Sequence, residues 1–94
     1  MKTKEPARLY YADGNIEEIY PNNGRDFKLE EIQKLIGGYI EIVYLSIDKI
    51  MIVDEEGKVK GLPSNVQATK VIRKYGIPDF IVGTAVVCHK NMLK

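Results

Sequence analysis

The chain has few of the residues from which catalytic and metal sites are built. Its 94 residues include one cysteine, one histidine and no tryptophan. The single cysteine, Cys88, excludes an intramolecular disulfide, and His89 has no cysteine or second histidine at zinc-ligand spacing. We therefore expect no metal site and no cofactor. Because Cys88 ends an apolar run, we expect its thiol to be buried in the core rather than reactive.

An excess of one charge sign is also missing. The chain has 14 basic and 13 acidic residues and a net charge of +1. This balance argues against a general nucleic-acid binder, which normally has a strong basic excess. No apolar run is long enough to span a membrane, and no secretory signal is visible. Together with the unpaired cysteine, these absences favour a cytoplasmic protein with no membrane association.

The length fits a single small domain over residues 1–94. Apolar residues make up 45% of the chain, which is enough for one core. A chain of this length buries only about 60–65% of its unfolded surface on folding, so oligomerisation could supplement its stability. We expect residues 1–7 and 89–94 to be flexible, the second segment being an exposed basic tail.

In the first half of the chain, turn residues separate two short strands from a helix. Asp13-Gly14 lies between β-prone runs at 8–12 and 15–20. This arrangement predicts a hairpin with a type I′ turn. Apolar residues at helical spacing predict a short helix over 27–36, with Asp26 as its N-cap and Gly37-Gly38 at its end.

The second half of the chain predicts further strands and one more helix. The helix covers 65–75, with its buried face formed by Ala68, Val71, Ile72 and Tyr75. The strands follow β-branched and aromatic runs at 39–45, 49–54, 58–60 and 80–88, the last in the middle of the sheet. The order β-β-α-β-β-(β)-α-β predicts an α+β fold, in which two helices cover one face of a mainly antiparallel sheet.

The start of the second helix is the segment best suited to ligand binding. Ser64, three residues before Gln67, matches a capping box, and the free N–H groups of a helix start can hold a phosphate. Asn65, Thr69 and Arg73 follow at i, i+4 and i+8, so they share one polar edge of the helix. This edge could bind ribose and phosphate groups, or it could only meet water. The sequence leaves both readings open.

Three neighbouring residues complete the candidate ligand-binding set. Lys70 would neutralise phosphate, and Glu55 could bind a ligand hydroxyl if its turn folds over the second helix. Gly83-Thr84 interrupts the last strand, which indicates a bulge or a close backbone approach that could open a pocket or be purely structural. The acidic turn around Glu55 lacks the alternating ligands of a calcium loop. No serine–histidine–acid signature is present, so no catalytic residue is assigned.

Three segments of the chain read LEEIQKLIGGYIEIVYL, IVDEEGKVKGLPSNVQAT and DFIVGTAVV, and they cover most of the chain from Leu29 onward. In combination they resemble a family of small domains from phages, prophages and bacterial mobile elements, whose function is unknown. Lys28 departs from the small polar helix cap of such domains. The resemblance implies no established enzyme activity. It implies a genomic setting in which small proteins act against host defences, several unrelated ones as homo-oligomers that sequester nucleotide immune signals.

These observations favour a non-enzymatic protein that binds a small phosphorylated or nucleotide-like ligand. By analogy of setting, it would be a phage anti-defence protein that sequesters a nucleotide-derived immune signal as a homo-oligomer in the bacterial cytoplasm. The alternative is a protein-interaction module that binds and inhibits a host enzyme through an exposed sheet face or edge. An enzyme is the third reading.

Overall fold

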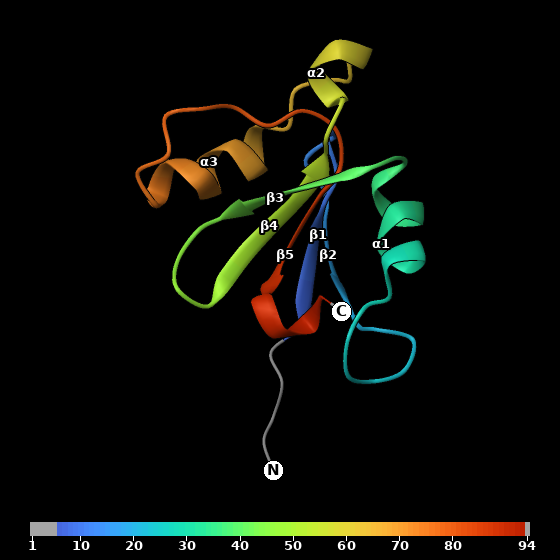
Figure 1. Ribbon diagram of the computed structural model, residues 1–94. Coiled ribbons are helices and arrows are strands. Elements are labelled where there is room, and N and C mark those ends of the chain that lie inside the picture. Colours follow the sequence, from blue (N-terminus) through green and yellow to red (C-terminus); the bar gives the residue numbers. More distant parts are fainter. Residues whose placement is uncertain (1–5, 94) are drawn as a thin grey trace.

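A computed structural model describes residues 6–93, which form one antiparallel sheet in the strand order β2-β1-β5-β4-β3 with helices around it (Figure 1). This architecture confirms the predicted α+β fold. The elements are β1 (Ala7–Tyr10), β2 (Ile16–Ile19), α1 (Leu29–Ile36), β3 (Ile40–Tyr44), β4 (Lys49–Asp54), α2 (Gly57–Lys60), α3 (Val66–Lys74), β5 (Ala85–His89) and the 3-10 turn η1 (Lys90–Met92).

The first hairpin forms as predicted, but its turn is of another type. The Tyr11 N–H donates to Asn15 O at 2.9 Å, and the Gly14 N–H donates to Tyr11 O at 3.0 Å. Within this turn only Gly14 has a positive φ, of 99°, so Asp13 does not adopt the left-handed conformation that a type I′ turn requires. Instead, the Asp13 carboxylate accepts the Asn15 N–H at 2.9 Å and stabilises a longer loop.

Helix α1 begins two residues later than predicted. Its N-cap is Lys28 rather than Asp26, and the Glu31 carboxylate accepts the Lys28 backbone N–H at 3.3 Å. Phe27 stays extended because its N–H donates to Met92 O and its side chain is buried. The helix ends at Gly37, whose φ is 94°, as the double glycine predicts.

Residues 58–60 form a helical turn, so the predicted short return strand is wrong. The buried Asp54 carboxylate accepts the Glu56 N–H at 2.8 Å and an N–H from Lys60 Nζ at 2.7 Å. These two bonds hold residues 56–60 close to Asp54, the last residue of β4. Gly61, with φ of 71°, then ends this turn.

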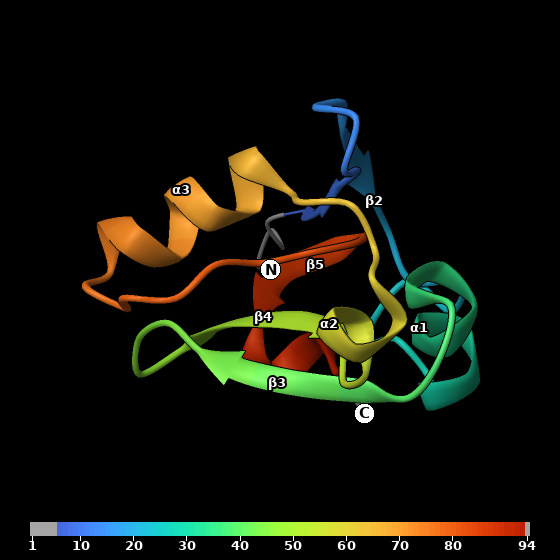
Figure 2. The same ribbon diagram turned by 90° about the horizontal axis from the view of Figure 1, so that it is seen from above.

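The helices cover opposite faces of the sheet, which corrects the prediction that both lie on one face. In both views the sheet lies between α1 and α3 (Figures 1 and 2). Along β4, Ile50 and Ile52 pack in the core under α1, whereas Met51 and Val53 pack in the core under α3. Alternation along a strand therefore buries the central strands on both sides.

β5 is central, as predicted, but it begins at Ala85 rather than at residue 80. Gly83, with φ of 74°, makes the close approach that its position suggests: an added Cβ would lie 2.8 Å from Leu62 Cδ1. The segment after β5 does not form the predicted exposed tail, because Met92 is buried beside Phe27 in the α1-side core. Residues 1–5 and 94 of the predicted flexible ends lie outside the described residues.

Candidate functional site

Asn65, the first residue of the predicted ligand-binding edge, is buried and fully engaged within the protein. Its side-chain oxygen accepts the Ala68 N–H at 3.0 Å, which makes Asn65 the N-cap of α3. Its Nδ2 donates to Tyr10 O at 2.9 Å and to Gly83 O at 2.7 Å. The predicted Ser64 capping box therefore does not form. Asn65 positions α3 rather than facing a ligand.

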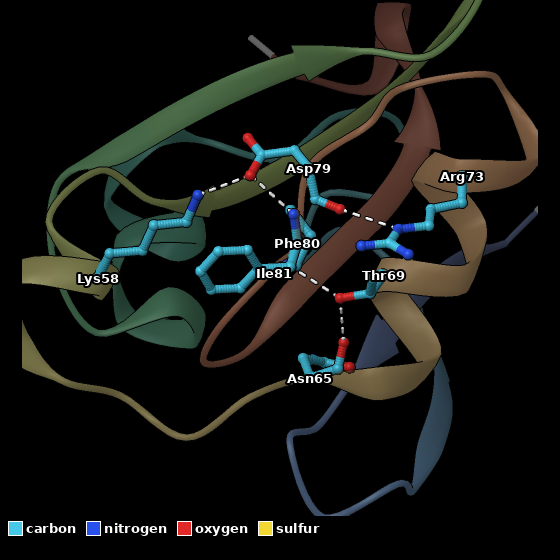
Figure 3. A network of polar contacts seen from close by, with 7 residues as sticks. All are labelled: Lys58, Asn65, Thr69, Arg73, Asp79, Phe80 and Ile81. Atoms are coloured by element: carbon cyan, nitrogen blue, oxygen red, sulfur yellow. Dashed lines mark hydrogen bonds and ion pairs between the residues drawn. The ribbon is translucent and has the colours of Figure 1, made fainter.

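The next two residues of that edge also bond within the protein (Figure 3). Thr69 Oγ1 donates to Asn65 O at 2.8 Å and accepts the Ile81 N–H at 2.9 Å. Arg73 Nε donates to Asp79 O at 3.1 Å. These contacts hold the extended segment before β5 against α3. The polar edge of α3 therefore mostly forms hydrogen bonds within the protein.

Asp79 extends this network to α2 (Figure 3). Its carboxylate accepts from Lys58 Nζ at 2.8 Å and from the Phe80 N–H at 2.7 Å. The Lys58 ammonium lies 4.2 Å from the centroid of the Phe80 ring. The bond from Lys58, followed by that from Phe80, lowers the pKa of Asp79 below its usual value.

The other predicted site residues do not converge on one pocket. Ser64 is exposed and pairs through its backbone with Val82. Lys70 is exposed on α3, and Thr84 is half-buried just before β5. Glu55 lies in the turn between β4 and α2, where it lines a hollow of about 150 Å³ together with Phe80. Among the described residues, Ser64, Lys70 and Thr84 do not line the hollow that contains Glu55.

A basic groove of about 440 Å³ lies on the α3 side of the sheet, between the sheet and the second half of α3. The strand register explains its walls: Arg8 is paired with Val87, and Lys49 is paired with His89. Directly paired residues point to the same face of a sheet. The groove is lined by Pro6, Arg8, Tyr10, Lys49, Val71, Lys74, Tyr75, Val87, Cys88 and His89.

The groove brings cations together, and its lining within residues 6–93 includes no acidic residue. Arg8 and Lys49 come from strands on the two sides of β5, and Lys74 comes from α3. Two carboxylates lie at the margins: Glu18 is paired with Arg8 across β1 and β2, and Asp48 Oδ2 lies 4.0 Å from His89 Nε2. A site of this charge attracts anions.

His89 contributes a fixed imidazole to this groove. Its Nδ1 accepts the Asn91 N–H at 3.1 Å, so Nε2 carries the ring proton in the neutral tautomer. The imidazole thus has one N–H available as a donor near Asp48 and Lys49. His89 is the last residue of β5, which corrects the prediction that it lies in an exposed tail.

Apolar and aromatic side chains complete the groove. Val87 lies between the cationic walls, and Tyr10 is buried beneath α3. Tyr75, predicted on the buried face of the helix, is 41% exposed and lines the groove instead. The combination of an apolar surface with a few convergent polar groups is typical of small-molecule sites.

The sequence contained only part of the information needed to find this groove. Alternation shows that Val87 and His89 share a face of their strand. It does not show that Arg8 and Lys49 flank that strand, because the order of strands in the sheet depends on tertiary packing.

A second, larger hollow of about 640 Å³ lies along α1. The positive charges of Lys28 and Lys34 in its lining are balanced by two glutamates.

Within residues 6–93, no cluster of side chains could hold a metal ion. None of the helices in this part of the chain is long and apolar enough to cross a membrane. Burial raises the pKa of the Cys88 thiol from 9.0 to about 11. Cys88 is therefore a core residue, as its sequence context predicts.

One family profile matches residues 8–92. The chain belongs to the DUF3846 family, a domain of unknown function. The DUF3846 match includes Arg8, Lys49, Lys74 and His89, so the whole basic wall of the groove lies within the domain. No curated protein and no solved structure matches the chain.

Proposed function

We propose that this DUF3846 protein is a non-enzymatic binder that holds a small phosphorylated ligand in the basic groove. The observation that carries this proposal is the convergence of Arg8, Lys49 and Lys74 around Val87, in a groove that the described residues line without an acid. The groove volume of about 440 Å³ suits a nucleotide-sized ligand. The groove replaces the helix start as the binding site, because Asn65 and Thr69 are bonded internally.

In this proposal the groove residues supply three kinds of contact: charge, a hydrogen bond and a packing surface. Arg8 offers a planar fork for two phosphate oxygens, and Lys49 and Lys74 act as point charges. His89 Nε2 donates one hydrogen bond. The ring of Tyr75 lies beside the apolar Val71 and gives a base or ribose a surface to pack on. Such a site recognises a phosphate joined to a flat, partly apolar group.

We propose binding without turnover because the groove residues supply positive charge and hydrogen-bond donors, and the Nδ1 atom of His89 already accepts the Asn91 N–H. Sequestration needs only affinity. In the phage setting that the family resemblance suggests, the ligand would be a nucleotide-derived immune signal, and the protein would be a cytoplasmic anti-defence protein. A homo-oligomer would carry one ligand-binding groove per subunit and so bind several ligands at once.

Isothermal titration with cyclic dinucleotides, ADP-ribose isomers and pyrophosphate tests the proposal. We expect Arg8→Gln and Lys74→Gln each to weaken binding about tenfold or more, because each removes a charge-assisted contact. Arg73→Gln is the matched control, since Arg73 is an exposed cation of α3 outside the groove. Absence of heat with every probe, or loss of binding only in Arg73→Gln, would exclude the groove. Ligand recovered intact after denaturation supports sequestration, and a new product indicates an enzyme.

A second candidate function is a protein-interaction module that inhibits a host enzyme. Exposed apolar side chains near α2 favour it: Val59 is 91% exposed, and Phe80 beside it is 47% exposed. A pull-down from host lysate separates the two candidates. A stoichiometric protein partner that is lost in Val59→Glu but kept in Arg8→Gln favours the interaction module over the ligand groove.

A further inference from the structure

Strand β3 has one edge whose backbone groups are unpaired. The Leu45 N–H donates to Lys49 O, and the Glu55 N–H donates to Tyr39 O, each at 2.9 Å. In an antiparallel ladder, bonding alternates along the strand, so the odd-numbered residues from 39 to 45 bond to β4. Ile40, Ile42 and Tyr44 therefore direct their N–H and C=O groups outward. Within residues 6–93 these groups have no backbone partner.

This edge also lacks the features that usually prevent strands from pairing between molecules. β3 reads IEIVY and contains no proline, no lysine and a single charge. The opposite edge strand, β2, is shorter, has two adjacent glutamates and is followed closely by Pro21. Figure 2 shows β3 at the margin of the sheet with no ribbon along its outer side. An uncovered edge of this composition favours association.

We propose that a second copy of this chain covers the edge, with β3 pairing antiparallel to β3 of the partner and the two sheets joining into one. The register centred on Ile42 uses every outward-facing residue. It places Ile42 opposite Ile42 of the partner subunit, and Tyr44 opposite Ile40 of the partner subunit. The contact is the same on both subunits, as a two-fold axis requires.

The side chains favour this self-pairing over a charged partner. On the α1 side of the sheet, the facing pairs are all apolar or aromatic, and Tyr44, which is 69% exposed, gains a neighbour. On the other side, Glu41 faces Val43 of the partner subunit, so the two glutamates are not directly opposed. Like charges directly opposite would destabilise the pair, and this register avoids them.

The pairing also leaves the basic groove accessible. The groove residues Arg8 and His89 belong to β1 and β5, which lie inside the sheet and away from the β3 edge. The dimer proposal is therefore independent of the proposed ligand. Oligomeric state is measured without ligand, and ligand binding is measured at the groove, so either proposal can fail alone.

Sedimentation velocity over a concentration series tests the proposal. We expect the wild-type chain to form a dimer, and Tyr44→Lys to raise its dissociation constant about tenfold or more, because a charge enters an apolar contact. Tyr20→Lys is the matched control: Tyr20 is 63% exposed and follows the other edge strand. Circular dichroism checks that both variants fold. A wild-type monomer at all concentrations, or equal effects of the two variants, would overturn the proposal.

A crosslinking experiment tests the register separately. Ile42→Cys places two thiols opposite each other across the two-fold axis, while Cys88 is buried and does not compete. We expect rapid formation of a disulfide-linked dimer under mild oxidation. Glu41→Cys is the control, because residue 41 faces residue 43 of the other copy. Faster crosslinking of Glu41→Cys than of Ile42→Cys would exclude this register.

Discussion

The side chain of Asn65 donates a hydrogen bond from Nδ2 to Gly83 O at 2.7 Å, joining the start of α3 to the turn that precedes β5. The same amide group donates to Tyr10 O, in β1. One buried side chain thus joins a helix to β1 and to the turn before β5. Burial in a low-dielectric interior makes such a satisfied amide specific for one arrangement of the three elements.

Replacement of Asn65 is expected to be strongly destabilising. Asn65→Ala removes the cap of α3 and leaves the carbonyls of Tyr10 and Gly83 without their donor. We expect the free energy of unfolding to fall by about 3 kcal/mol. Urea denaturation measures this loss. Ser64→Ala should change stability by less than about 0.5 kcal/mol, because Ser64 is exposed and is not the cap. Equal losses in both variants would contradict the cap assignment.

Gly83 and Gly24 form a natural pair for separating backbone strain from steric overlap. Both have positive φ, of 74° and 78°, but an added Cβ meets Leu62 Cδ1 at 2.8 Å only at Gly83. We expect Gly24→Ala to cost about 1 kcal/mol from the left-handed conformation alone. Gly83→Ala should cost about 1–2 kcal/mol more, because Leu62 must move.

Thermal unfolding of the two glycine variants and of the double variant Gly83→Ala with Leu62→Ala measures this difference. The double variant should cost less than the sum of its two single changes, because removing the Leu62 side chain relieves the overlap. A simple sum would show that strain alone accounts for the effect of Gly83→Ala.

Most of the fold could be predicted from the sequence because its determinants are local. Gly37 ends α1 where it was expected to, and the β-branched runs of β3 and β4 form strands. Two of the errors come from hydrogen bonds that periodicity in the sequence does not reveal. The bond from Lys60 to Asp54 stabilises a helical turn at residues 58–60. The bond from the Phe27 N–H to Met92 O keeps Phe27 extended and outside α1.

The candidate site was harder to predict than the fold. Spacing correctly placed Asn65, Thr69 and Arg73 on one edge of a helix, but spacing does not show what packs on that edge. The segment containing Asp79 and Ile81 occupies it. The groove depends on Arg8 and Lys49 lying on either side of β5, and only the strand order brings them there.

The Cys88 thiol is expected to resist modification in the native protein. Burial raises its pKa to about 11, so very little reactive thiolate exists at pH 8. Labelling with a thiol reagent should proceed only as fast as the protein unfolds, and it should become rapid in urea. Because the unfolded thiol ionises near its ordinary pKa of 9.0, stability should also fall as pH rises from 9 towards 11. Fast labelling of the native protein would show that the thiol is exposed by local opening.

The Asp54–Lys60 pair should contribute to stability at neutral pH and lose that contribution in acid. Burial alone would raise the pKa of Asp54, but the bonds from Lys60 and from the Glu56 N–H outweigh burial and lower it. A lowered native pKa means that the carboxylate stabilises the fold above its unfolded pKa of about 4. This stabilisation is lost as pH falls through the lower native value.

Lys60→Met should therefore reduce the free energy of unfolding by about 2 kcal/mol at pH 7, because it leaves the carboxylate of Asp54 buried without its cation. The same change at Lys58 is the matched control. Lys58 pairs with Asp79, and both of these side chains are about half exposed, so its loss should cost less than about 1 kcal/mol. Urea denaturation at a series of pH values should show the wild-type and Lys60→Met curves converging below about pH 4. Parallel curves down to the lowest pH would mean that Lys60 does not set the protonation of Asp54.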